Sequence, residues 1–194
     1  RPLSWGTALV GEGELLYLFG SGGEAKTATT VVARLPVADL VRSEPVLRPS
    51  YLLRGERAPI WSDRFDAERL YEIEGLPGTS EATIDRVPGA ERWSTPQIPP
   101  LDFGIREYRA ERLLGPWRDH GVVYWIPAPW SAPRPQGTAS FAAYAAKAHP
   151  ELGAPGAAAI SYNVNVAFGT LEEAIEAVET VHGFYVPQML ERVP

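Results

Sequence analysis

The chain has 194 residues, of which 45% are hydrophobic and 22% charged, and its formal net charge is −6. This acidic balance, without any Lys/Arg cluster, excludes a footprint for nucleic acid or for an anionic membrane surface, and no apolar run is long enough to predict a membrane span. The absence of Cys excludes disulfides, thiolate catalysis and Cys-ligated metals, while 19 Pro, 18 Gly and 6 Trp are typical of a turn-rich β protein, here read as one domain over residues 1–194.

The strands expected along the chain fall into three units, each with the order strand, Gly-containing turn and strand. These units occupy residues 5–19, 81–95 and 144–163. A further β-prone run follows each unit, at 29–35, 104–109 and 183–190, and outer strands are predicted at 51–54 and 122–126. The pattern predicts an all-β fold of about three antiparallel blades of a β-propeller.

Three blades form only part of a ring, because propellers normally have about four to eight. The last unit also lacks an outer strand before Pro194, and the chain does not begin with Met. We therefore expect at least one blade to lie outside this chain.

One helix is predicted near residues 170–182. Thr170 and Glu173 have the spacing of a capping box, and Gly183 supplies the stop. The apolar positions between them have helical spacing: Leu171, Ile175, Val178 and Val181. We expect this helix to be an insertion packed on the outside of the last blade.

The site is expected where the innermost strands of the blades open at one end of the central channel. The aligned starts of these strands are residues 4–7, 80–83 and 145–149. Glu81 heads an otherwise apolar strand, where low-dielectric walls would disfavour its charged form and suit it to general acid catalysis. The alternative is a solvated Glu at a strand end.

Two polar sets accompany Glu81. Lys147, His149 and Glu151 share one strand face by period two and would grip sugar hydroxyls or a carboxylate, although an exposed edge strand carries the same pattern without function. Asn163 and Asn165 also share a face and offer the donors and acceptors that hydroxyls require, although Asn is common at strand ends as well.

Metal and nucleotide sites are not indicated. The three His, at positions 120, 149 and 182, have no spacing that suggests a metal site, and the chain has no nucleophile elbow, P-loop or dinucleotide fingerprint. No cofactor is expected. Among the aromatic residues Trp117, Tyr124, Trp125 and Trp130, we interpret Trp117 as packing between blades rather than as a stacking platform for sugars.

Several segments together resemble secreted five-bladed propeller proteins of actinobacteria, formerly of unknown function, which look related to furanosidase- and arabinanase-type glycoside hydrolases. The segments are Trp5-Gly-Thr-Ala, Leu113-Leu-Gly-Pro-Trp117, residues 146–152, residues 161–165 and Tyr185-Val-Pro-Gln. The resemblance implies a secreted or cell-surface protein that acts on carbohydrate, with Glu81 matching a Glu that opens an inner strand. It also implies channel-mouth roles for Lys147, His149 and Asn163.

This chain departs from the family at two places. The family extends further on the N-terminal side, where its catalytic Asp would be expected, and residues 63–78 match it poorly. The resemblance therefore leaves open whether the second catalytic carboxyl is in this chain.

Glycoside hydrolysis requires two carboxyl groups, about 5–5.5 Å apart for retention or about 6.5–9.5 Å for inversion. We expect Glu81 as general acid or base, and Glu151 or a residue of the absent blades as its partner. The expected substrate contacts are Trp5, Lys147, His149, Asn163 and Asn165. Two alternatives stay open: a non-catalytic propeller that binds carbohydrate or protein, and one chain of an assembly in which a second chain supplies the remaining blades.

Overall fold

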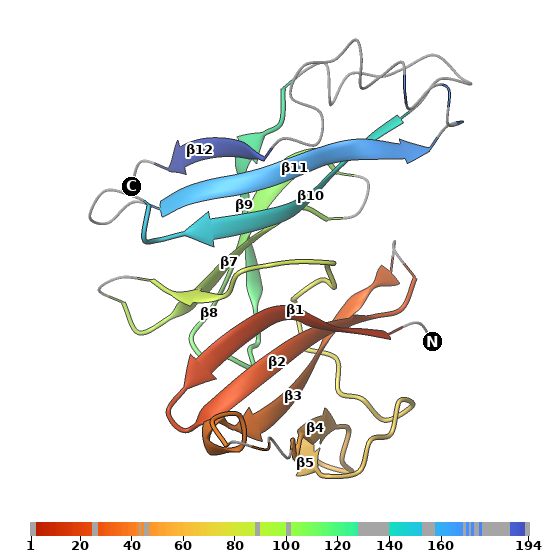
Figure 1. Ribbon diagram of the computed structural model, residues 1–194, viewed down its shortest axis with the longest axis vertical. Helices are drawn as coiled ribbons and strands as arrows, with labels where there is room; N and C mark the ends of the chain where they lie inside the picture. Colours follow the sequence, from red (N-terminus) through yellow and green to blue (C-terminus); the bar gives the residue numbers. More distant parts are fainter. Residues whose placement is uncertain are drawn as a thin grey trace.

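The protein forms three antiparallel sheets that follow one another along the long axis of the molecule (Figure 1). The computed structural model describes residues 3–24, 27–42, 44, 47–87, 90–99, 102–127, 140–152, 158–168, 170, 172, 175 and 187–192. Within each sheet the strands lie in sequence order, so each sheet is a meander.

The first sheet contains β1 (Leu3–Glu12), β2 (Leu15–Gly22), β3 (Thr29–Pro36), β4 (Ser50–Leu53) and β5 (Ile60–Ser62). The second contains β6 (Asp85–Arg86), β7 (Trp93–Gln97), β8 (Gly104–Ala110) and β9 (Arg118–Trp125). The third contains β10 (Ser140–His149), β11 (Ala158–Phe168) and β12 (Gln188–Arg192). A 3₁₀ turn, η2 (Val37–Asp39), follows β3.

The sheets pack face to face through two apolar layers. One layer joins the first sheet to the second through side chains such as Phe19, Val32, Trp93 and Trp117. The other joins the second sheet to the third through residues such as Ile105, Ile160 and Val164. The second sheet is therefore covered on both faces, which explains why both faces of β7 and β8 are largely buried.

Trp117 connects the outer part of the second sheet to this core. Its side chain is 3% exposed, its indole Nε1 donates to Leu113 O at 3.2 Å, and its backbone N donates to Glu74 O at 2.9 Å. Gly75 has a φ of +76° and lies so close that a Cβ there would stand 2.0 Å from Trp117 O. The packing role predicted for Trp117 is confirmed.

The all-β prediction is confirmed, and most of the strands lie where the sequence placed them. β1–β4 and β6–β12 each overlap a predicted strand, β6 only over two residues, whereas the short β5 was not predicted. The described residues form three open sheets and no closed ring.

The strand predicted at 81–87 is wrong over most of its length, since only Asp85 and Arg86 pair with β7. Residues 81–84 are not assigned to a strand, because their hydrogen bonds go to the neighbouring sheets instead. The helix predicted near 170–182 lies largely outside the described residues, as do the turns at 88–89 and 153–157 and the side chain of Trp130.

Candidate functional site

A short segment, residues 79–86, lies between the first and third sheets and contacts both (Figure 1). On one side, Ala82 N donates to Thr7 O of β1 at 2.8 Å. On the other, Ala148 N of β10 donates to Thr83 Oγ1 at 2.6 Å. The segment therefore links the first strands of two sheets that are distant in sequence.

Alternation of side chains along this segment sorts apolar from polar residues. Ala82 and Ile84 are buried in the layer between the first two sheets. Glu81, Thr83 and Asp85 lie on the other side, toward β10, where Glu81 Oε2 is 2.5 Å from Lys147 Nζ. The segment, the end of β10 and Ser161 of β11 therefore form one group of polar side chains. We call it the 81–151 cluster: Glu81, Thr83, Asp85, Lys147, His149, Glu151 and Ser161.

A β-bulge in β10 sets the direction of the side chains that enter this cluster. Tyr144 pairs with Asn163 and Lys147 pairs with Ser161, so β10 advances by one residue more than β11 does. Ala145 has a positive φ of 56°, a conformation that non-Gly residues seldom adopt. Because an extra residue shifts the alternation, the bulge decides which face Lys147 and His149 occupy.

His149 connects two of the polar groups. Its Nε2 is 2.8 Å from Ser161 Oγ, and its Nδ1 is 3.3 Å from Glu151 Oε1. An ionised carboxylate only accepts hydrogen bonds, so Nδ1–H donates to Glu151. In the neutral ring Nε2 is then the acceptor of the Ser161 hydroxyl proton, an order of groups found at nucleophilic serines.

The surroundings of Asp85 alter its acid–base behaviour. Its pKa is raised above the ordinary value of 3.8, chiefly because partial burial disfavours the charged form and also because Glu151 is near. The charge of His149 acts in the opposite direction. Asp85 therefore keeps its proton to a higher pH than a solvated aspartate does.

Of the predicted site residues, the structure brings together Glu81, Lys147, His149 and Glu151. Asn163 and Asn165 lie further along β11 at alternate positions after Ser161, on the face that Ser161 occupies. The buried positions between them, Tyr162 and Val164, face the apolar layer instead.

Trp5 makes its ring contacts within the first sheet rather than with these residues. Its ring packs within the first sheet, against Gly20 and against Tyr51 at 5.9 Å between ring centroids. Through these contacts the Trp5 ring contributes to the packing of the first sheet.

Sequence reasoning missed Asp85 and Ser161. A signal for both was present, since period two from Glu81 leads to Asp85, and period two back from Asn163 leads to Ser161. Neither residue stood out by type, and only the fold shows that each faces His149 or Glu151.

No group of three or more His, Asp or Glu side chains within the described ranges could hold a metal ion. Among the same residues, no helix has the length and apolar character needed to cross a membrane.

Comparisons with known proteins show a likeness in structure but none in sequence. No protein-family model matches the chain, and no curated protein matches it. A crystal structure from Bacteroides ovatus, described as a "putative hydrolase", matches 97% of this chain with a TM-score of 0.67 and 18% sequence identity. The match covers 44% of that protein, so this chain spans less than half of its length. At this identity the likeness shows the shared fold.

Proposed function

We propose that the three sheets are consecutive blades of a β-propeller, and that the 81–151 cluster hydrolyses glycosidic bonds in a furanose-containing, arabinan-type polysaccharide outside the cell. The arrangement of the leading segments supports the propeller. β1, residues 79–86 and β10 each open a meander, and hydrogen bonds place them in a row. In a propeller the innermost strands of successive blades surround the channel in this way.

The raised pKa of Asp85 beside Glu151 is the observation that carries the proposed chemistry. Glycoside hydrolysis needs one carboxyl group that holds a proton for the leaving oxygen and one carboxylate that acts as base or nucleophile. Asp85 fits the first role and Glu151 the second. Glu81, the acid expected from the sequence, already uses its carboxylate to hold Lys147. We therefore propose that Glu81 and Lys147 contact the substrate or act as a supporting base.

The surroundings of these carboxyl groups suit a polyhydroxylated substrate. Asn163 and Asn165 continue the polar face beyond Ser161, and amide groups both donate to and accept from hydroxyls. Glu81 and Lys147 remain about half exposed, with 47% and 37% of their side chains accessible. These charged and amide groups are therefore accessible to a chain of sugars.

The test is release of reducing ends from arabinan by the full protein and by Asp85→Asn, with Asp63→Asn as the matched control. Asp63 is exposed and lies outside the cluster. We expect Asp85→Asn to lose roughly 10²–10⁴-fold in rate and Asp63→Asn to retain it. An aryl arabinofuranoside with an acidic leaving group does not need protonation, so its cleavage should fall much less in Asp85→Asn. Equal losses on both substrates would contradict the acid role.

A second candidate function follows from the Ser161–His149–Glu151 contacts of 2.8 and 3.3 Å. These three groups have the order nucleophile, base and orienting carboxylate that ester hydrolysis uses. The test is cleavage of acetylated sugars by the protein and by Ser161→Ala. Loss of ester cleavage in Ser161→Ala, with sugar release from arabinan absent from the start, would favour this candidate.

Two further alternatives are distinct from both: a non-catalytic binding propeller and a chain completed by a second chain. A propeller that binds carbohydrate or protein would bind arabinan without turnover in the unmutated protein. A chain completed by a second chain would gain activity when that chain is added. Both outcomes are read in the same reducing-end assay combined with a direct binding measurement.

A further inference from the structure

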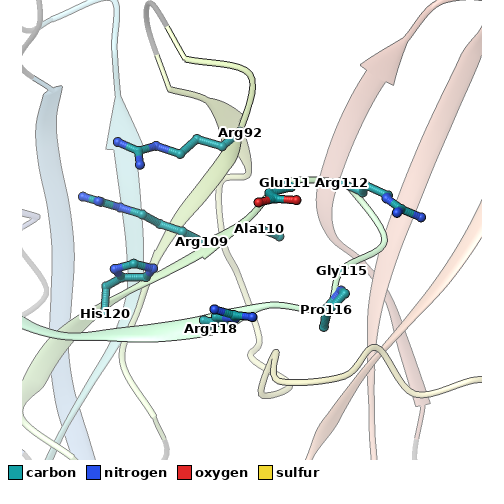
Figure 2. Close-up of a pocket in the computed structure, with 9 residues that line it drawn as sticks. All are labelled: Arg92, Arg109, Ala110, Glu111, Arg112, Gly115, Pro116, Arg118 and His120. Atoms are coloured by element: carbon teal, nitrogen blue, oxygen red, sulfur yellow. The ribbon is translucent and has the colours of Figure 1, made fainter.

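A pocket lies away from the 81–151 cluster, at the end of the second sheet where β8 leads into β9. It has a volume of about 380 Å³, and its lining includes four arginines, Arg92, Arg109, Arg112 and Arg118, together with His120 and a single carboxylate, Glu111 (Figure 2). We call it the arginine pocket. Four arginines in one hollow are unexpected on a chain whose net charge is −6.

The strand register concentrates this charge at a cost. Arg109 of β8 pairs directly with Arg118 of β9, and like charges opposite each other destabilise a sheet. Among the described residues, no ion pair neutralises Arg92, Arg112 or Arg118. The fold therefore holds positive charge in the pocket without compensating most of it.

Arg109 is held in place by an ion pair with Glu107. Its Nη2 contacts Oε2 of Glu107, a residue whose side chain is 5% exposed and whose Oε1 accepts from Ser94 Oγ at 2.8 Å. Its Nε is buried without a hydrogen-bond partner. This arrangement orients one guanidinium and leaves part of its donor capacity unused.

The loop that forms the opposite wall of the pocket is anchored in the apolar core. Gly115 and Pro116 line the pocket, and the next residue, Trp117, is buried and donates its backbone N to Glu74 O. A loop anchored in this way keeps the hollow open before any ligand arrives, which lowers the entropy cost of binding.

We propose that the arginine pocket binds a small ligand that carries an oxyanion, a phosphate or carboxylate borne on a body the size of a sugar. Guanidinium groups bind such anions through paired N–H donors. Figure 2 shows Arg92 and Arg109 extending in the same direction, toward the side of His120, whereas Arg112 points the other way. A volume of about 380 Å³ exceeds the needs of a bare ion and lies within the range of small-molecule sites.

The proposal is independent of the proposed hydrolysis, so it is tested by binding alone. Isothermal titration of the full protein would use glucose 6-phosphate, glucuronate, neutral glucose and inorganic phosphate. The variants are Arg118→Gln and Arg92→Gln, both at exposed positions, with Arg57→Gln as a control that removes the same charge elsewhere on the surface. Circular dichroism confirms that each variant is folded.

We expect glucose 6-phosphate or glucuronate to bind at least tenfold more tightly than glucose or inorganic phosphate, and the preferred anion identifies the phosphate or carboxylate source. Each pocket variant should weaken that binding at least fivefold, whereas Arg57→Gln leaves it unchanged. Glu111→Gln, which removes the pocket's carboxylate, should tighten it. Added NaCl should weaken it, as for any charge-driven contact. Equal affinity for glucose and the anionic sugars, or binding that Arg118→Gln and Arg92→Gln leave intact, would overturn the proposal.

Discussion

Replacing Gly75 by Ala probes the contact that holds the β8–β9 loop to the core. A Cβ at Gly75 would stand 2.0 Å from Trp117 O and 2.9 Å from Trp117 C. Both atoms belong to the backbone of a buried residue, so a side-chain rotation cannot relieve the clash. Glu74 O next to it also accepts the hydrogen bond from Trp117 N.

Two costs add in this variant. The φ of +76° costs an L-residue with a Cβ about 1–2 kcal/mol. Displacing packed backbone costs about 1–3 kcal/mol more. We therefore expect Gly75→Ala to lower the free energy of unfolding by about 2–5 kcal/mol.

Gly13→Ala is the matched control. Gly13 also has a positive φ, +60°, but an added Cβ there would meet nothing within 4 Å. It should lose only the conformational part, about 1–2 kcal/mol. Urea denaturation of both variants measures the two losses, and equal losses would refute the close approach of Gly75 to Trp117.

Three further predictions concern the 81–151 cluster. Thr83→Val removes the acceptor of Ala148 N while keeping the shape of the side chain, so urea denaturation should show a loss of about 1–3 kcal/mol; no loss would place Thr83 elsewhere. A double-mutant cycle of Glu81→Gln and Lys147→Gln should give a coupling free energy of about 0.2–1 kcal/mol between the two side chains. This coupling should shrink in high salt because both groups are partly exposed, and a salt-independent coupling would contradict the ion pair. The folded-state pKa of Asp85 is raised, so the stability that Asp85 contributes is complete below pH 3.8 and is lost as the pH rises through the folded pKa. Asp85→Asn should therefore be more stable than the unmutated protein at pH 7 and show no such gain at pH 3. A gain at acid pH alone would contradict the raised pKa.

The sequence was most informative about strands. Alternation and Gly-containing turns located β1, β2, β7, β8 and β11, because each of these strands buries an apolar face. The same reasoning failed at residues 81–84, whose composition is β-like but whose hydrogen bonds go to two other sheets. Composition cannot distinguish a strand from an extended segment that bridges sheets.

Site residues could be predicted only in part. The prediction that the strand starts near Glu81 and Lys147 face each other agrees with their 2.5 Å ion pair. The contact of His149 with Ser161 depends on the bulge at Ala145, and one residue more or less would turn His149 to the other face. The raised pKa of Asp85 depends on burial by a neighbouring sheet, which no local pattern encodes.

The arginine pocket illustrates the same limit. Arg92, Arg109 and Arg118 come from three different strands or their approaches, and they meet only because β8 lies between β7 and β9. In the sequence they are isolated basic residues in an acidic chain. Register, rather than local composition, gathers them.

The most direct measurement of the central claim compares Asp85→Asn with the unmutated protein for release of reducing ends from arabinan across pH 4–8. We expect turnover by the unmutated protein that falls as Asp85 loses its proton with rising pH, and a loss of at least about a hundredfold in Asp85→Asn. Unchanged turnover and an unchanged pH profile in Asp85→Asn, or binding of arabinan without any turnover by the unmutated protein, would contradict it.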